Sequence, residues 1–201
     1  MFRLLLLLVL ASPAAFAADA ILVFGDSLSA GYGIGAEQSW PSLLSRRVQA
    51  DGLPYTVANA SISGETTAGG KSRLPAVLDR FKPAVVVIAL GANDGLRGLP
   101  VEQMRANLLA MISAAQQRRA AVLLVGMKLP PNYGPDYTAR FESAFRDAAQ
   151  QRKVALLPFL LEPIAAERDA FQPDGLHPVA AVQPKILDHV WRALRPLLRR
   201  P

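Results

Sequence analysis

Three residues whose side chains together can carry out acyl transfer lie near opposite ends of the chain. Ser27 follows an apolar run that stops at Gly25, and Asp174 and His177 are three residues apart near the other end. A serine hydroxyl is a weak nucleophile unless a base removes its proton, and that base needs an acid to fix its tautomer. Gly175 allows a turn that brings the Asp174 carboxylate to Nδ1 of His177 and leaves Nε2 facing Ser27. We therefore expect a serine, histidine and aspartate triad.

Each of these segments also has an ordinary structural explanation. Asp26 and Ser27 are of the types that cap helix N-termini, and Asp-Gly is a common turn pair. The two interpretations of Ser27 are compatible, because a helix N-terminus fixes the hydroxyl and supplies N–H groups that favour negative charge. The other histidine, His189, lies in a helical pattern, where we expect a surface or edge residue.

The tetrahedral intermediate of acyl transfer carries an oxyanion that needs hydrogen-bond donors. Asn93 offers its side-chain amide, Gly64 an unshielded backbone N–H, and Ser27 its own backbone N–H. Taken singly, Asn93 and Gly64 are turn residues. All three follow the carboxyl ends of predicted strands, and in open α/β sheets ligands bind at that edge. Together they predict an oxyanion hole with three donors.

Five short apolar runs that lack polar alternation are predicted as strands: residues 21–24, 55–58, 85–90, 121–125 and 154–157. Strands covered on both faces have this pattern, which favours a parallel sheet flanked by helices. Three further segments place apolar side chains at helical spacing, as a core-facing helix does. They are residues 103–119, starting near Pro100 as a first-turn proline, and residues 137–148 and 182–194. No internal repeat or linker is found, so we expect one domain.

The first residues have the three parts of a secretory signal peptide. Met1-Phe2-Arg3 is cationic, residues 4–10 are apolar, and Ala15-Phe16-Ala17 is a small-x-small cleavage pattern. We expect cleavage before Ala18, so that 1–17 is removed and 18–201 is the mature domain, exported to the periplasm or secreted. The alternative is an uncleaved anchor, although the apolar stretch is shorter than the roughly 20 residues of a membrane span.

Composition excludes several kinds of site. The chain has no cysteine, which excludes disulfides, thiolate metal sites, cysteine nucleophiles and a lipoprotein anchor. Its 22 Lys and Arg against 16 Asp and Glu give a net charge of +6 that is spread along the chain. We find no nucleic-acid motif and expect no nucleic-acid partner. Four C-terminal arginines could give a transient contact with a membrane surface of anionic phospholipid, or form a solvated helix end: Arg192, Arg195, Arg199 and Arg200.

Four blocks, in this order, resemble the motif blocks of the GDSL, or SGNH, hydrolases. They are Gly25-Asp26-Ser27-Leu28-Ser29, Gly64, Gly91-Ala92-Asn93-Asp94 and Asp174-Gly175-Leu176-His177. The resemblance spans essentially all of the mature chain, and residues 59–66, 93–98 and 129–134 extend it toward bacterial multifunctional thioesterases and secreted arylesterases. Two positions differ from the pattern of this subgroup. Its members often have a second glycine at the position of Ala92 and an arginine at the position of Lys128.

The resemblance implies a three-layer α/β/α sandwich around a parallel sheet of about five strands, as in flavodoxin-like folds. It implies Ser27 as the nucleophile, Asp174 and His177 as its partners, and Ser27, Gly64 and Asn93 as oxyanion donors. The implied reaction is hydrolysis of carboxylic esters and thioesters, with arylesterase, acyl-CoA thioesterase and lysophospholipase activity. No cofactor and no metal are expected.

The substrate expected from this resemblance is a small-molecule acyl ester, thioester or lysophospholipid, bound by a monomer. Residues 95–99 directly follow Asn93, combine glycines with apolar side chains, and resemble a family loop that moves over the acyl chain. We expect an acyl groove there, although local packing beneath the loop is an equally simple explanation. The groove would be lined by residues 127–133 and by Leu96, Leu99, Pro130 and Tyr133.

Three other functions fit parts of the sequence. Residues 31–36 match a relaxed G-x-G-x-x-A dinucleotide motif with Asp51 about 20 residues on, but they do not directly leave the strand. Asp174, His177 and another carboxylate could form a metal hydrolase, which full activity in EDTA would exclude. The third is a non-catalytic carrier of carbohydrate or lipid, and turnover that depends on Ser27 would exclude that as the sole role.

Overall fold

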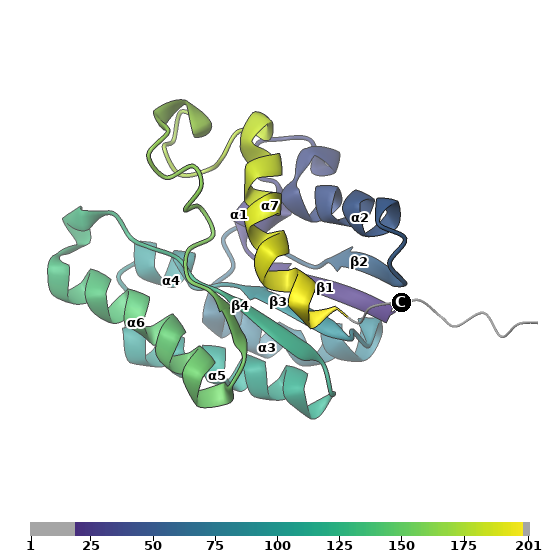
Figure 1. Ribbon diagram of the computed structural model, residues 1–201. Coiled ribbons are helices and arrows are strands. Elements are labelled where there is room, and N and C mark those ends of the chain that lie inside the picture. Colours follow the sequence, from purple (N-terminus) through teal and green to yellow (C-terminus); the bar gives the residue numbers. More distant parts are fainter. Residues whose placement is uncertain (1–18, 199–201) are drawn as a thin grey trace, which may run out of the picture.

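The computed structural model describes residues 19–198, which fold around one parallel sheet (Figure 1). The sheet has five strands in the order β2-β1-β3-β4-β5. The strands are β1 Asp19–Gly25, β2 Tyr55–Asn59, β3 Val85–Ala89, β4 Ala121–Val125 and β5 Ala155–Leu157. Each matches a predicted strand, and the predicted α/β fold with its central parallel sheet is confirmed.

The continuous apolar runs reflect burial of both faces of the sheet. In β1, Ile21 and Val23 belong to one core cluster while Leu22 and Phe24 belong to the other, because successive side chains point to opposite faces. All five residues of β3 are buried. A polar side chain on either face would lie in a core, so polar alternation is absent.

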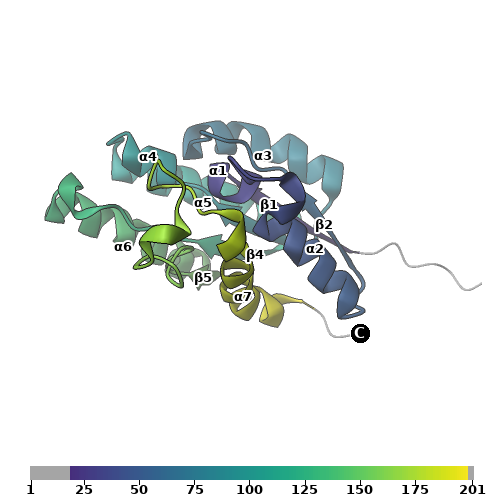
Figure 2. The ribbon, with the colours of Figure 1, turned by 90° about the horizontal axis from the view of Figure 1, so that it is seen from above.

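Helices cover the two faces and complete the three layers (Figures 1 and 2). One face is covered by α2 Trp40–Ala50 and α7 Gln183–Leu194, and the other by α3 Thr67–Phe81, α5 Val101–Gln117 and α6 Pro135–Arg152. Two short helices, α1 Ser27–Ala30 and α4 Ala92–Leu96, follow β1 and β3. Short 3-10 helices are η1 Ala36–Gln38, η2 Pro131–Tyr133, η3 Arg168–Ala170, η4 Ala180–Val182 and η5 Arg195–Leu197.

Two helix starts differ from the sequence prediction. Pro100 is the N-cap of α5 and not a first-turn residue, because its ψ of 121° is extended and the helix begins at Val101. Val182 ends η4 and precedes α7, whose first turn contains Pro184. A proline near each start fits the general preference, but its place relative to the cap depends on the backbone angle.

In residues 19–198 no helix is both long and apolar enough to cross a membrane. The predicted signal peptide, residues 1–17, lies outside the described residues. Its cleavage before Ala18 and the domain boundary there stay predictions.

Candidate active site

The register of the sheet brings three loops to one edge. Gly25 at the end of β1 pairs with Ala89 of β3, and Val23 pairs with Asn59 at the end of β2. The segments that follow these strands therefore begin side by side, as expected for the carboxyl edge of a parallel sheet. They carry Ser27, Gly64 and Asn93, which line one cavity.

Ser27 is held at the start of α1 by a tight turn from β1. Asp26 is the N-cap and accepts a hydrogen bond from the Leu28 N–H at 3.0 Å. The capping role considered for Asp26 and Ser27 therefore belongs to Asp26. A Cβ at Gly25 would meet the Ser29 hydroxyl at 2.8 Å and the Ala89 carbonyl at 3.0 Å. Gly25 therefore allows the Ser29 side chain and the Ala89 carbonyl to approach the end of β1 closely, and the turn that follows leaves the Ser27 hydroxyl in the cavity.

The second half of the site is a short hairpin between Phe171 and Pro178, which form an antiparallel bridge. The Gln172 N–H donates to the His177 carbonyl at 2.8 Å and closes the hairpin. Gly175 at its tip has a φ of 68°, a left-handed conformation that glycine adopts readily, and it forms the turn that the sequence allowed. The hairpin holds the Asp174 and His177 side chains on one side of the turn.

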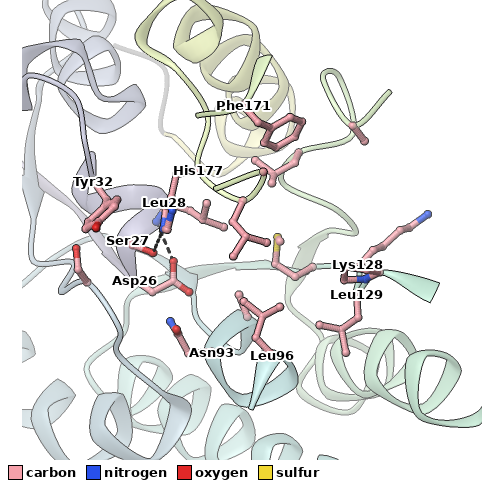
Figure 3. A pocket seen from close by; sticks show the side chains of 18 of the residues that line it. Asp26, Ser27, Leu28, Tyr32, Asn93, Leu96, Lys128, Leu129, Phe171 and His177 are labelled. Atoms are coloured by element: carbon pink, nitrogen blue, oxygen red, sulfur yellow. Dashed lines mark hydrogen bonds between the residues drawn. The ribbon is translucent and has the colours of Figure 1, made fainter. Parts of the chain in front are cut away.

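Asp174, His177 and Ser27 form a continuous hydrogen-bonded line. Nδ1 of His177 lies 2.7 Å from Oδ2 of Asp174, and Nε2 lies 2.9 Å from Oγ of Ser27. Figure 3 shows the His177 ring directly above Ser27. With the proton on Nδ1, Nε2 is the acceptor that the Ser27 hydroxyl needs.

The Asp174 carboxylate is strongly stabilised in its charged form. Its other oxygen, Oδ1, accepts the backbone N–H of His177 at 3.0 Å and of Leu176 at 2.8 Å. The His177 N–H, then the imidazole, then the Leu176 N–H lower the pKa of Asp174 to about 2. Asp174 therefore stays an acceptor at neutral pH and fixes the tautomer of His177.

Asp26 is the opposite case. It is 2 % exposed, and burial raises its pKa from 3.8 to about 6, against the smaller opposing effects of the Leu28 N–H and of His177. The carboxyl precedes Ser27 directly in the chain and lines the cavity. The sequence indicated Asp26 only as a cap, since the burial of a single residue in a turn has no pattern.

The three predicted oxyanion donors are available for a ligand. The Ser27 and Gly64 N–H groups have no hydrogen-bond acceptor within residues 19–198. The Asn93 amide donates one N–H to the Glu65 carbonyl at 3.0 Å, which leaves its second N–H. The Glu65 contact fixes the amide plane, and all three donors border the cavity that contains the Ser27 hydroxyl.

An ion pair fastens the loop that carries Gly64 and Glu65. Nε of Arg73 donates to the Glu65 carboxylate at 2.9 Å, and its Nη1 donates to the Ala60 carbonyl at 2.8 Å. The Arg73 guanidinium also lies 4.2 Å from the centre of the Phe24 ring. Both partners are mostly buried, with 25 % and 13 % of their side chains exposed. No sequence pattern indicated this ion pair.

A second polar cluster ties α4 to the start of α3. The buried Asp94 accepts the Thr67 N–H at 2.8 Å and the Thr67 hydroxyl at 2.5 Å, and the Asn107 amide donates to that hydroxyl at 3.1 Å. Asp94 follows Asn93 directly, so these bonds hold the backbone of Asn93, the predicted oxyanion donor. The position of Asp94 in the motif was the only sequence signal for this role.

The cavity has a volume of about 440 Å³, which is within the range of small-molecule sites. Its wall is mostly apolar, and Figure 3 shows Leu96 and Leu129 of this wall on one side of Ser27 and His177. The apolar wall includes Leu28, Leu96, Met127, Leu129, Pro130, Phe159, Leu161, Ala165 and Phe171.

The residues predicted for an acyl groove divide into two groups. Leu96 and Pro130 line the cavity, whereas Leu99 and Tyr133 do not. The Tyr133 hydroxyl donates to the Leu96 carbonyl at 3.0 Å and braces that residue, and Leu99 is 38 % exposed. Tyr133 therefore packs beneath the loop, which was the alternative to an acyl groove, and does not line the cavity.

Gly95 is a packing glycine. The residue is buried, and a Cβ there would meet the Phe141 ring at 2.5 Å and Leu129 at 2.8 Å. The expected loop that moves over the acyl chain includes Gly95, and the tight packing of Gly95 contradicts mobility at this position. Gly98, with a φ of 64° and no atom within 4 Å of a built Cβ, fits such mobility.

The remaining predicted features have structural roles. His189 is half-buried, which fits the predicted edge position, and its Nε2 lies 3.0 Å from the carbonyl of Phe159 in the cavity wall. The candidate dinucleotide motif, residues 31–36, begins at Gly31, the C-cap of α1. It does not leave the end of β1 directly, as a dinucleotide-binding motif does. Within residues 19–198 no group of three or more His, Asp or Glu side chains could hold a metal ion.

Comparison with known proteins gives relatives over nearly the whole chain. It is 50 % identical over 182 residues to Esterase TesA of Pseudomonas aeruginosa, covering 90 % of both chains. It is 40 % identical to Thioesterase 1/protease 1/lysophospholipase L1 of Escherichia coli K12, covering 96 % of this chain and 91 % of that one. The crystal structure of the psychrotrophic esterase EstA from Pseudoalteromonas sp., inhibited by monoethylphosphonate, superposes with a TM-score of 0.85 at 40 % identity, covering 89 % and 97 %.

A family model described as GDSL-like Lipase/Acylhydrolase matches residues 23–183, which include every residue of the hydrogen-bonded line and the three donors. The fold, the order of the motif blocks and the relatives agree with this match. The chain therefore belongs to the GDSL-like lipase/acylhydrolase family and is an esterase of the SGNH type.

Proposed function

We propose that the protein is an exported serine esterase that hydrolyses acyl esters and thioesters through an acyl intermediate on Ser27. The observation that carries the proposal is the line from Asp174 through His177 to Ser27, with distances of 2.7 and 2.9 Å. A hydroxyl, a base and an acid at these distances meet the geometric requirement for nucleophilic catalysis.

In the first half of the reaction, Oγ of Ser27 attacks the carbonyl carbon while Nε2 of His177 takes the hydroxyl proton. Asp174 accepts the Nδ1 proton and stabilises the imidazolium. The carbonyl oxygen becomes an oxyanion that the N–H groups of Ser27, Gly64 and Asn93 stabilise. The bond to the leaving alcohol or thiol then breaks, and Nε2 donates its proton to that group.

In the second half, a water molecule replaces the leaving group. His177 takes a proton from the water, the oxygen attacks the acyl carbon, and the same three donors stabilise the second intermediate. The bond to Ser27 breaks, and Nε2 returns the proton to Oγ. A carboxylic acid is released, and no cofactor or metal takes part.

The apolar wall of the cavity supports an acyl substituent as the group bound beside Ser27. Burial of apolar surface contributes about 0.8 kcal/mol for each methylene, so an aliphatic chain gains affinity along this wall. The relatives are named as an esterase and as a thioesterase and lysophospholipase, which supports esters, thioesters and lysophospholipids as substrate classes. The shared triad serves all of these, so the fold does not choose among them.

The proposal includes export directed by residues 1–17 and a monomer that acts on small-molecule substrates. It also includes transient contact with a membrane surface through the C-terminal arginines. Arg192 lies in the last turn of α7 and Arg195 begins η5, while Arg199 and Arg200 lie outside the described residues.

Substitution of Ser27 by alanine tests the proposed nucleophile. We expect Ser27→Ala to lower kcat on a p-nitrophenyl ester by about 10⁴ to 10⁶, the loss found when a triad member is removed. Ser29→Ala is the matched control, because Ser29 lies buried in the same short helix and its hydroxyl has no partner within residues 19–198. Near-normal turnover by Ser27→Ala would contradict the proposal.

The substrate range is tested by kcat/KM across acyl chain lengths for ester, acyl-CoA and lysophospholipid substrates. Ser27→Ala serves as the blank for each series. We expect kcat/KM to rise with chain length until the apolar wall is filled. A series in which chain length has no effect would contradict binding of the acyl group at that wall.

A further inference from the structure

Tyr32 is a large aromatic residue that is exposed at the active site and takes no part in the reaction as derived above. Its side chain is 53 % exposed, and its ring centre lies 4.5 Å from that of His177 at an interplanar angle of 38°. Tyr32 also lines the cavity. Exposed aromatic residues are common, so a function for Tyr32 requires evidence that its position is built into the site.

The backbone on both sides of Tyr32 is fixed to the two catalytic segments. The Tyr32 N–H donates to the Ser27 carbonyl at 3.3 Å. The Gln172 amide donates to the Tyr32 carbonyl at 2.8 Å and to the Pro178 carbonyl at 3.2 Å. The Gln172 side chain thereby connects the segment after Ser27 to the hairpin that carries His177.

The glycines that flank Tyr32 make this connection possible. Gly31 and Gly33 have φ values of 79° and 72°, which L-residues rarely adopt. A Cβ at Gly33 would lie 2.1 Å from the Gln172 side-chain oxygen, so only glycine leaves room for the connecting amide. The Tyr32 ring is exposed, but the Tyr32 backbone is held by hydrogen bonds to Ser27 and Gln172.

Tyr32 and the apolar wall lie on opposite sides of the reacting atoms. Figure 3 shows Tyr32 on one side of Ser27 and His177, and Leu96 and Leu129 on the other. A substrate carbonyl on Ser27 has two substituents, the acyl chain and the leaving group. The acyl chain fits the long apolar wall, which leaves the side of Tyr32 for the leaving group.

The chemistry of the reaction places the leaving atom beside the same ring. Nε2 of His177 must come within about 2.6 to 3.2 Å of the leaving oxygen to donate its proton. In a phenyl ester that oxygen is bonded directly to the aromatic ring. The phenyl ring is then adjacent to the His177 imidazole and to the exposed face of Tyr32, where it can make an aromatic contact.

We propose that Tyr32 forms a leaving-group subsite that selects esters of planar aromatic alcohols. The proposal rests on the proposed function, because it assigns one side of the same site. In the step concerned, Ser27 Oγ forms a bond to the acyl carbon, the bond from that carbon to the phenolic oxygen breaks, and Nε2 gives its proton to that oxygen. Tyr32 contacts the departing ring, and it neither gives nor takes a proton.

The size of the effect follows from the energy of an aromatic pair. Such a pair contributes about 0.5 to 1.5 kcal/mol beyond burial, which is about a twofold to tenfold preference in kcat/KM. The preference belongs in kcat/KM, because this quantity reports acylation, the step in which the leaving group is present. Deacylation starts from the same acyl enzyme for every leaving group, so its rate does not depend on the ring.

The test compares phenyl butyrate with 2,2,2-trifluoroethyl butyrate, which share an acyl group and differ in the ring. The ratio of their kcat/KM values is measured for the wild type and for Tyr32→Leu and Tyr32→Phe. Using a ratio for each protein removes the difference in chemical reactivity between the esters. Ile62→Ala is the matched control, since Ile62 is 48 % exposed and does not line the cavity.

We expect Tyr32→Leu to lower the ratio of phenyl to trifluoroethyl ester by about twofold to tenfold, and Tyr32→Phe and Ile62→Ala to keep it. If Tyr32 only positioned the imidazole, Tyr32→Leu would lower kcat/KM by the same factor for both esters. It would also shift the pH profile of both reactions. That result, or an unchanged ratio, overturns the proposal. If the proposed function itself is wrong, Ser27→Ala hydrolyses both esters as well as the wild type does.

A measurement on the unaltered protein gives a second test that does not depend on folding of the variants. Phenol and cyclohexanol are compared as competitive inhibitors of the hydrolysis of trifluoroethyl butyrate. We expect phenol to inhibit at a concentration about twofold to tenfold lower than cyclohexanol. Equal inhibition by the two alcohols overturns the proposal.

Discussion

Asp26 provides a direct test of the electrostatics beside Ser27. Its carboxyl is 2 % exposed, and burial raises its pKa from 3.8 to about 6. Between those two pH values the folded protein binds the proton more tightly than the unfolded chain does. The stability contributed by Asp26 is therefore fully present below pH 3.8 and is lost as the pH rises through 6.

The magnitude follows from the two pKa values. A shift of one pKa unit corresponds to 1.36 kcal/mol, so the ionised carboxylate costs about 3 kcal/mol of unfolding free energy at pH 7.5. In Asp26→Asn the amide oxygen can still accept the Leu28 N–H, and no charge is buried. The variant should gain about 2 to 3 kcal/mol relative to the wild type between pH 4 and pH 7.5.

Urea denaturation at pH 4, 5, 6 and 7.5 measures this difference. Comparing Asp26→Asn with the wild type at each pH cancels the titration of all other groups, and the change of that difference with pH cancels any fixed cost of the amide. Asp79→Asn is a control whose free-energy difference from the wild type should change little over this range, because the hydrogen bond from Arg118 lowers the pKa of Asp79 below its usual 3.8. A free-energy difference between Asp26→Asn and the wild type that does not change with pH would refute the reasoning.

The remaining predictions concern the oxyanion hole. Asn93→Ala should lower kcat by about 10² to 10³ with little change in KM, because the donor acts in the transition state; steady-state kinetics that show only a raised KM would make Asn93 a substrate-binding residue. Arg73→Met should lower kcat by up to about tenfold by releasing Glu65, whose carbonyl orients Asn93, and Arg73→Lys should recover part of the loss. Thermal unfolding is measured alongside, and a lowered Tm with unchanged kcat would limit Arg73 to a structural role.

Much of the fold could be predicted because burial of both sheet faces leaves a direct pattern. The apolar run in β3 has one simple explanation, a strand between two cores. The hairpin geometry was also accessible, since Asp174 and His177 are close in sequence and Gly175 supplies the left-handed turn. Such local features depend on few residues and are therefore visible without tertiary structure.

The supports of the site could not be predicted, because they join residues far apart in sequence. The hydrogen bond between Asn93 and Glu65 spans 28 residues, and that between Gln172 and Tyr32 spans 140. The raised pKa of Asp26 likewise depends on burial by distant elements. Leu99 and Tyr133 have suitable side chains for a groove, but the loop direction that takes them away from the cavity has no sequence signal.

Covalent labelling of the nucleophile tests the central claim most directly. The wild type, Ser27→Ala and Ser29→Ala are treated with a p-nitrophenyl alkylphosphonate, and peptide mass spectrometry locates the modified residue. We predict one phosphonyl group for each chain, on Ser27, with loss of esterase activity in proportion to labelling. Ser29→Ala should label normally and Ser27→Ala should not label. A group on another residue, or inactivation of Ser27→Ala at the wild-type rate, would contradict an acyl intermediate on Ser27.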